Sequence, residues 1–373
     1  MTARGNKTNS EVRNNIPDVR GQMILSAIVS EHLASGQPIG SKIIAEKFAG
    51  KSGLSSATIR NVMGELEALG LLEQPHTSAG RIPTDKGYRF YVDNLLGILS
   101  LSNEDIRMIN SELGLGDLSG NDAPDRIMER TSQLLSALSN NVGIVVSPSL
   151  ADDRLQHIEF VKLSEKRVLV VLVSNPRIVH NKLVHVNEDF TQDELDRTSR
   201  YLNVEFEGKS LVAIRSEILV RMHEEKALFD DLLQMAMILC SQSIDDNQEL
   251  HGEVYVDGAS NILSKRDFSD DLDQLRKLLK TIEEKSRLVQ ILNECISSEK
   301  AMTDNVRVFI GGENKAEPLQ DCAIITAPYR IGNDSAVGTI GVLGPTRIEY
   351  ARMISVVSYL ARTLERIMVS ENL

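Results

Sequence analysis

Tryptophan is absent from this 373-residue sequence, and cysteine is limited to Cys240, Cys295 and Cys322. The three cysteines are far apart, odd in number and without CxxC spacing, so the sequence predicts neither a disulfide framework nor a zinc site. We expect them to be buried free thiols in a reducing cytoplasm.

Long hydrophobic runs are also lacking. No apolar run approaches the ~20 residues that a membrane-spanning helix needs. The N-terminal stretch MTARGNKTNSEVRNN is polar and lacks the apolar core of a signal peptide. With 42% hydrophobic and 25% charged residues, the composition is typical of a soluble globular protein. The chain is too long for one typical core, so we expect two or three domains and a cytoplasmic location.

No convincing set of catalytic or metal-binding residues is present. His180 and His185 are five positions apart in a strand-like run, which places them on opposite faces of a strand and argues against a shared metal ion. Gly311 and Gly312, like the glycines of residues 341–344, belong to no phosphate-binding motif such as GxxxxGKS or GxxxxGKT, and we assign them to turns. We therefore expect no enzyme activity, no metal and no cofactor.

Positive charge is scarce in most of the chain. The net charge is −12, but residues 1–96 carry 11 Lys and Arg against 9 Asp and Glu, a net charge of +2. An acidic remainder would repel DNA from every surface except that of the first 96 residues. Charge thus permits DNA binding only at the N-terminal end.

The residues that organise the chain lie between positions 54 and 96. Ser55 and Ser56 can cap a helix, an apolar stripe follows at Ile59, Val62, Met63, Leu66 and Leu69, and Gly70 ends it. Upstream, residues 19–35 predict a helix with Met23, Ile24, Ala27, Ile28 and Leu33 facing inward. Residues 42–48 predict a second helix, capped by Ser41, with Ile43, Ile44 and Phe48 on its apolar side. Short helices joined by glycine-containing turns predict a helix-turn-helix.

The opposite face of the 54–69 helix carries Ala57, Arg60, Asn61 and Gly64. Small side chains allow close approach to a polyanion, while Arg can bridge guanine O6 and N7 and Asn can pair with adenine. The competing interpretation is that Arg60 is an ordinary solvated residue of the helix. Glycine inside a helix costs roughly 0.5–1 kcal/mol relative to alanine, which close approach of Gly64 to DNA or to the first helix would offset.

A winged helix is predicted because a short hairpin follows the helix. Within residues 74–84, Pro75 and Pro83 bracket the tip of the hairpin and disfavour a central strand. Arg81, the one fixed charge of this segment, is expected at the tip. His76 can contact DNA or the hairpin's own backbone. The helix expected from Thr84 to about Leu99 then connects the DNA-binding domain to the rest of the chain, with Lys86 and Arg89 on a solvated face. Our DNA-binding candidates are Lys42, Lys51, Ser55, Ser56, Thr58, Arg60, Asn61, His76, Thr77, Ser78 and Arg81.

The string LSSATIRNVMGELEALGLLEQPHTSAGRIPTDKGYRFYVD closely resembles the signature of the heat-inducible transcription repressor HrcA family. ATIRN followed by PHTSAGRIPT and KGYRFYVD is a long and specific match. The resemblance implies a repressor that binds an inverted-repeat operator upstream of chaperone genes as a homodimer. It also implies that a GroEL-type chaperonin holds the repressor in its active form, and that a GAF-like domain carries an inserted dimerisation domain.

The remaining patterns give an α+β multidomain fold: an N-terminal winged helix-turn-helix and a GAF-like α/β domain interrupted by a helical inserted dimerisation domain. A helix is expected at 125–140, and the strands at 142–146, 155–162, 168–173, 178–186, 306–310, 323–329 and 336–343. Capping boxes are expected at Thr191–Glu194 and Thr346–Glu349. The spacing of Phe268, Leu272, Leu275, Leu279 and Ile282 fits either a coiled-coil-like seam or ordinary helix packing, and we prefer ordinary packing. A long helix is expected at 211–243, with Met222, Met235 and Met237 as core filler or an adaptable interface.

The predicted domain boundaries are 1–100 for the winged helix, 101–124 for a linker, 125–189 and 285–373 for the two parts of the GAF-like domain, and 190–284 for the inserted dimerisation domain. The alternative function is a winged-helix regulator gated by a small-molecule effector in the GAF-like domain. A ligand that stabilised the protein and changed operator affinity would favour it.

Overall fold

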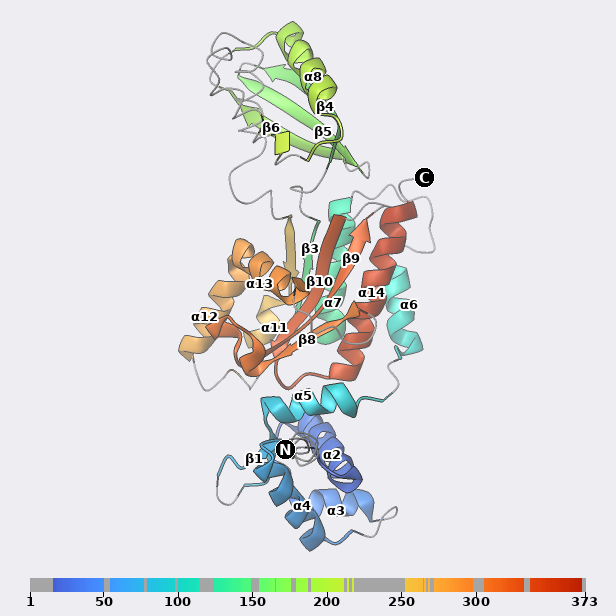
Figure 1. The fold of residues 1–373 in the computed structure, drawn as a ribbon, viewed down its shortest axis with the longest axis vertical. Coiled ribbons are helices and arrows are strands. Elements are labelled where there is room, and N and C mark those ends of the chain that lie inside the picture. Colours follow the sequence, from blue (N-terminus) through green and yellow to red (C-terminus); the bar gives the residue numbers. More distant parts are fainter. Residues whose placement is uncertain are drawn as a thin grey trace, which may run out of the picture.

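The computed structural model describes residues 16–49, 54–76, 79–97, 100–113, 124–148, 154–164, 166–175, 179–186, 189–210, 213–214, 217, 252–263, 265, 268, 272–297, 305–331 and 336–370. They form three units stacked along the long axis (Figure 1). We call residues 16–97 the head, residues 100–148 and 252–370 the body, and residues 154–217 the outer unit. No helix among the described residues is long and apolar enough to span a membrane.

The head has the predicted helix-turn-helix. Its helices are α2 (Val19–Ser35), α3 (Ser41–Phe48) and α4 (Ser56–Ala68). Ile24, Ile28 and Ile59 are fully buried between them, as their spacing predicted. Met23 and Ile43 were predicted to face inward but are exposed, because each lies one position away from the buried stripe of its helix.

The start of α3 also corrects the sequence analysis. Ser41 was predicted as the helix cap, but Gly40 occupies that position and no side chain caps the helix. Ser41 is the first helical residue instead. Its hydroxyl lies 2.9 Å from that of Ser56, at the start of α4, so Ser41 connects two helices rather than capping one.

The wing is a minimal hairpin of β1 (Leu72–Glu73) and β2 (Ile82–Pro83), paired antiparallel. Arg81 forms an isolated bridge with Ile39 in the loop before α3, and both N–H···O distances of this bridge are 2.9 Å. The neighbouring Gly80 leaves no room for a side chain, since a Cβ there would lie 2.4 Å from the Ile39 carbonyl carbon. Gly80 thus permits the close contact between wing and helix-turn-helix.

Helix α5 (Asp85–Asn94) begins at the predicted cap Thr84 but ends sooner than expected. Leu99, the predicted end of its apolar face, lies outside the described residues. Helix α6 (Asn103–Glu112) occupies part of the segment predicted as linker. It is capped by Ser102 and joined to the C-terminal part of the body by an ion pair between Asp105 and Arg352, with the nitrogen and oxygen 2.9 Å apart.

The body contains a five-stranded antiparallel sheet in the order β7-β3-β10-β9-β8. Its strands are β3 (Val142–Val146), β7 (Val254–Asp257), β8 (Arg307–Ile310), β9 (Cys322–Ile331) and β10 (Ala336–Pro345). Helices α7 (Pro124–Ser139) and α14 (Tyr350–Ser370) pack on one face, and α11 (Ala259–Leu263), α12 (Leu272–Glu283) and α13 (Lys285–Ser297) on the other (Figure 1). Cys295 and Cys322 are buried free thiols in the second layer, where burial raises both pKa values to about 12.

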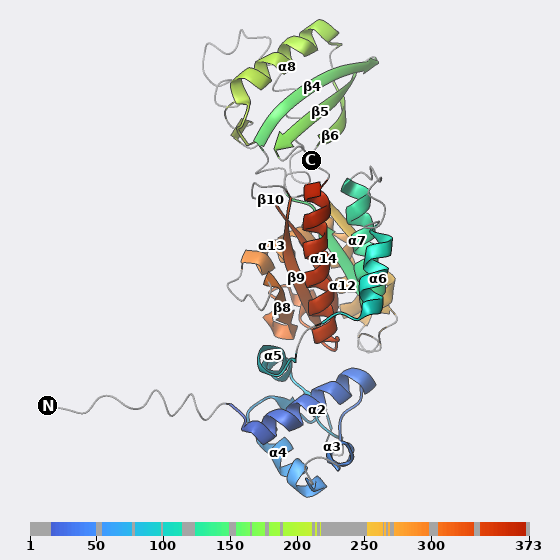
Figure 2. The ribbon, with the colours of Figure 1, turned by 90° about the vertical axis from the view of Figure 1, so that its right-hand side faces the viewer.

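The outer unit has its own sheet and core (Figure 2). Its strands β4 (Arg154–Ser164), β5 (Arg167–Asn175) and β6 (Val179–His185) pair antiparallel, and α8 (Gln192–Phe206) covers one face. Helix α8 begins with the predicted Thr191–Glu194 capping box. Phe160 and Phe206 are fully buried between sheet and helix.

This arrangement corrects the predicted domain break at residue 190. The chain leaves the five-stranded sheet after β3, builds β4–β6 and α8 outside it, and returns at β7, which pairs directly with β3. Strands β4–β6 therefore belong with α8, although the sequence analysis assigned them to the same domain as β3. Strand β7 lies in a range that was predicted to be entirely helical.

Two further predictions concern helices. The final helix begins at Tyr350, with the Glu349 carbonyl accepting from the Met353 amide, so Thr346–Glu349 is not a capping box. In α12, Leu272 is exposed while Leu278 and Ile282 are buried in the body's core, which agrees with the preferred prediction of ordinary helix packing and not with a coiled-coil-like seam. The predicted helix at 211–243, with its three methionines, lies almost entirely outside the described residues.

Candidate nucleic-acid interface

The exposed face of α4 carries the residue types expected to meet DNA. Ala57, Arg60, Asn61 and Gly64 are all exposed, as the helical periodicity predicted. Arg60 forms no ion pair or side-chain hydrogen bond with any described residue, so its guanidinium is available to an external partner. Ile59, on the opposite side of the helix, is fully buried.

The hydroxyl groups at the start of α4 are partly committed to the helix itself. Ser55 caps it by accepting from the Thr58 amide at 3.1 Å, and its Oγ also lies 2.9 Å from the Thr58 hydroxyl. Ser56 is turned toward Ser41. The first turn contains no acidic residue, so the positive end of the helix dipole is not neutralised there. This end of α4 therefore favours a phosphate group.

Gly64 leaves open space around it. A Cβ built at this position would have nothing within 4 Å, so the glycine does not make room for α2 or any other part of the described chain. Of the two interpretations of Gly64, the intramolecular one is removed.

The remaining DNA-binding candidates differ in their exposure and in their contacts within the chain. Lys42 on α3 and His76 in the wing are exposed, and the His76 carbonyl accepts from the Ala79 amide at 2.8 Å. Arg81 lies at the base of the wing rather than at its tip. Its guanidinium pairs with Glu67 of α4 at 2.9 Å, which ties the wing to that helix. Lys51, Thr77 and Ser78 lie outside the described residues.

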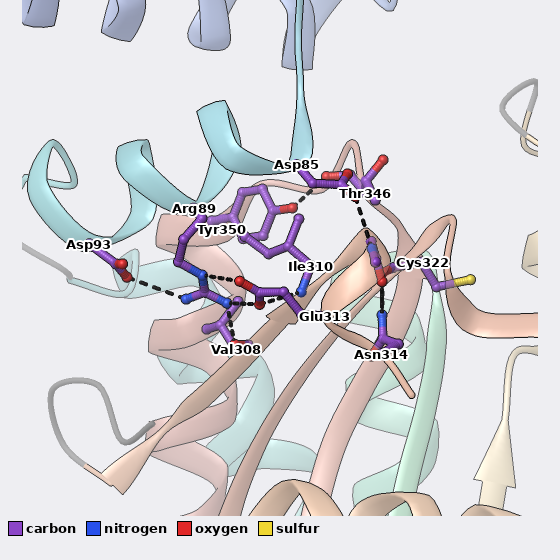
Figure 3. Close-up of polar contacts among 12 residues, drawn as sticks. Asp85, Arg89, Asp93, Val308, Ile310, Glu313, Asn314, Cys322, Thr346 and Tyr350 are labelled. Carbon is purple, nitrogen blue, oxygen red and sulfur yellow. Dashed lines mark hydrogen bonds and ion pairs between the residues drawn. The ribbon is translucent and has the colours of Figure 1, made fainter. Parts of the chain in front are cut away.

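Helix α5 joins this surface to the body through a polar cluster that the sequence analysis missed. Arg89 was predicted to be solvated, yet its Nε donates to Glu313 Oε1 at 2.9 Å, and its Nη2 contacts both Glu313 Oε2 and the Val308 carbonyl oxygen (Figure 3). Asp93, one turn along α5, lies 3.3 Å from Nη1 of the same guanidinium. Burial alone would lower the pKa of Arg89, but the hydrogen bonds and charges of Glu313 and Asp93 raise it above its ordinary value.

Further contacts between head and body surround this ion pair. The Asp85 carboxylate accepts from the Gly312 amide at 2.8 Å. The rings of Tyr88 and Tyr350 lie 5.8 Å apart, and the Tyr88 hydroxyl is 2.7 Å from His32 Nδ1 on α2. The buried apolar residues of the head and of the body face covered by α7 and α14 consequently form one continuous cluster. Arg89 and Glu313 are 224 positions apart, so no local pattern could have revealed their pairing.

Two family models match the chain in agreement with this architecture. The model described as "Winged helix-turn-helix transcription repressor, HrcA DNA-binding" matches residues 18–94, and "HrcA protein C terminal domain" matches residues 125–354. The chain belongs to the HrcA family. This confirms the resemblance found in the sequence, and the family is one of heat-inducible transcription repressors.

Relatives match along almost the whole chain. A heat-inducible transcription repressor HrcA of Geobacter sulfurreducens is 38% identical, with 94% of this chain and 98% of the relative covered. One of Syntrophobacter fumaroxidans is 36% identical, with 94% and 97% covered. A crystal structure described only as a hypothetical protein has the same overall fold, with a TM-score of 0.60 at 22% identity and 95% and 99% of the two chains covered.

Proposed function

We propose that this chain acts as a homodimeric repressor that binds an inverted-repeat operator upstream of chaperone genes. The observation that carries the proposal is the exposed face of α4, where Arg60 and Asn61 stand between the small residues Ala57 and Gly64. With α4 in the major groove, Arg60 would donate two hydrogen bonds to a guanine and Asn61 would pair with an adenine. Phosphates would be held by the start of α4 and by Lys42 and Lys51, and the other proposed DNA contacts are Ser55, Ser56, Thr58, His76, Thr77, Ser78 and Arg81.

An inverted-repeat target follows if two heads are related by a twofold axis. We assign the dimer contact to the outer unit, on the sheet face opposite α8. Leu183 of β6 alternates with the buried Val184, so it lies on that face, and it is 45% exposed; Leu163, at the irregularity of β4, is 54% exposed. Leu183 pairs with Leu169 of β5, which in turn pairs with Val161 of β4, so an apolar row crosses all three strands. Large exposed apolar groups in a continuous row are typical of an interface.

Regulation by a GroEL-type chaperonin completes the proposal. The chaperonin would hold the repressor in its active form, and unfolded clients would compete for it under heat. The resulting loss of active repressor would raise transcription of the chaperone genes. Because the family is one of transcription repressors, this function agrees with the expectation that the chain is not an enzyme.

The deciding experiment is binding of the full-length protein to an inverted-repeat chaperone-operator duplex and to a scrambled duplex of the same composition. Salt must be fixed, because phosphate contacts make affinity strongly salt-dependent. Preference for the operator, strengthened by chaperonin, is the expected result. Equal binding to both duplexes would refute the operator assignment, while operator preference that is indifferent to chaperonin would remove the chaperonin from the proposal.

A second candidate is gating by a small anionic effector in a GAF-like body. It is favoured by Arg307 of β8, whose buried Nε and Nη1 have no hydrogen-bond partner among the described residues. Thr326, paired with it on β9, has a buried hydroxyl that likewise finds no partner in the described part of the chain. A buried guanidinium is costly unless it is paired, so a carboxylate or phosphate group fits this position. A thermal-shift screen of such anions, with Arg307→Met as control, would identify a ligand. Operator binding measured with and without that ligand must then show a change in affinity.

A further inference from the structure

Helix α5 is fixed firmly to the DNA-facing part of the head. Thr84, which caps α5, donates its hydroxyl hydrogen to the Gly70 carbonyl oxygen at 2.7 Å, and Lys86 Nζ donates to the Leu69 carbonyl oxygen at 2.8 Å. Gly87 packs so closely on Leu71 that an added Cβ would lie 2.0 Å from its carbonyl oxygen. Residues 69–71 directly follow α4, so α5 cannot turn without turning α4.

The body side of the same contact is equally constrained. Glu313, in the short helix η7 (Gly311–Glu313), accepts from the Ile310 amide at 3.1 Å as well as from Arg89. Asn314 follows it, and its Nδ2 lies within hydrogen-bonding distance of the carbonyl oxygens of Gly311, Leu319 and Cys322, at 3.0, 2.9 and 2.9 Å. Figure 3 shows Asn314 beside Cys322. The turn between β8 and β9 is therefore held in one shape, and the Glu313 carboxylate has a fixed direction.

The guanidinium of Arg89 is the element that joins these two constrained parts. A planar guanidinium that contacts both oxygens of a carboxylate restricts angle as well as distance, which a lysine cannot do. Both partners are largely buried, with 19% and 20% of their side chains exposed, so solvent screens the pair less than it does an exposed one. Asp85, at the first turn of α5, adds a second fixed point through the Gly312 amide.

We propose that Arg89 and Glu313 are positioning residues that set the angle at which the body presents α4, and through it the half-site spacing that the dimer accepts. This inference rests on the proposed operator binding. Two heads held at fixed angles can both bind only when each half-site faces its head. Heads that turn freely bind at several half-site spacings, but the second head then has a lower effective concentration at its half-site.

The test uses the full-length protein and operator duplexes whose half-site spacing increases in steps of one base pair over a full helical turn. Adding about 5 base pairs places the second half-site on the opposite side of the duplex. We expect the wild type to bind the best spacing at least ~10-fold more tightly than the half-turn-shifted one, and Arg89→Ala to reduce this ratio to about 2 or less. Arg89→Lys keeps the charge but not the fork, so it should give an intermediate ratio.

Arg352→Ala is the matched control, because Arg352 and Asp105 form a similar ion pair within the body, between α14 and α6. It should leave the spacing preference unchanged. If Arg89→Ala unfolds the protein, as followed by circular dichroism, Glu313→Gln takes its place and retains the shape of the side chain. An Arg89 or Glu313 variant with unchanged spacing preference overturns the inference, as does a wild type that binds the operator at every spacing equally. A wild type that does not distinguish operator from scrambled DNA refutes the proposed function instead.

Discussion

Replacing Gly64 with alanine should make the protein more stable and weaken its binding to operator DNA. The first effect arises from the helix propensity of the backbone at Gly64, and the second from the space that glycine leaves on the surface of α4. Gly64 lies in the interior of α4, where glycine is unfavourable, yet the described chain does not use the space that glycine leaves open. The space is therefore available to a bound duplex.

The size of the stability effect follows from helix propensity alone. An added methyl group meets no atom within 4 Å, so neither strain nor new packing contributes. Glycine to alanine in an exposed helix interior should then raise the free energy of unfolding by ~0.5–1 kcal/mol. For a cooperative unit of 150–250 residues, this corresponds to a rise in Tm of roughly 1–4 °C.

Thermal unfolding and operator binding should be measured on the same preparations. Gly87→Ala is a suitable control, since its methyl group would lie 2.0 Å from the Leu71 carbonyl oxygen and should destabilise the protein. A Gly64→Ala variant that is no more stable than the wild type would refute the reasoning about free space. A stabilised variant with unchanged operator affinity would show that this part of α4 does not approach the DNA closely.

Three further predictions concern other parts of the chain. Arg60→Ala should lose about 1–3 kcal/mol of specific binding and relax base preference at one position of each half-site, and unchanged discrimination in a competition assay would contradict the role assigned to Arg60. Leu183→Glu should shift the protein toward monomer in light scattering, whereas Val204→Glu, on α8 where Val204 is already 81% exposed, should not; a stable Leu183→Glu dimer would place the interface elsewhere. The hydrogen bond from Arg352 lowers the pKa of Asp105 in the folded protein. The ionised carboxylate therefore stabilises the fold fully above its unfolded-state pKa of about 3.9, and this stabilisation is lost as pH falls through the lower folded-state pKa. Asp105→Asn should therefore flatten the acid limb of the unfolding free energy measured against pH, and an unaltered limb would exclude this linkage.

Local patterns predicted most individual elements correctly. The bounds of α2 and β3 agree with the structure to the residue, because an apolar period of 3.6 and a short run of buried β-branched residues are both local signals. The exposed face of α4 was predicted for the same reason. Strand β7 escaped detection, since its four residues are too few to establish an alternating pattern within a region predicted to be helical.

Relationships between distant residues could not be predicted in this way. Strands β3 and β4 follow one another along the chain, and only their pairing partners show that they belong to different sheets. The role of Arg89 depends on Glu313, far along the chain, and the role of Ser41 depends on the position of Ser56. The direct DNA contacts remain predictions, because they depend on a partner molecule.

The pairing of β3 with β7 has a consequence for the order in which this protein folds. The last residue of β3, Val146, lies opposite the first residue of β7, Val254, and the Ser147 amide donates to the Glu253 carbonyl oxygen at 2.8 Å. Everything between them is in effect the loop of one hairpin, and contacts across so long a loop form late. Until then the edge of β3, a strand whose five residues are all buried in the finished sheet, remains open to other chains. An intermediate of this kind exposes an apolar strand edge of the sort that chaperonins bind, so the proposed dependence of the repressor on a chaperonin would act first on its folding.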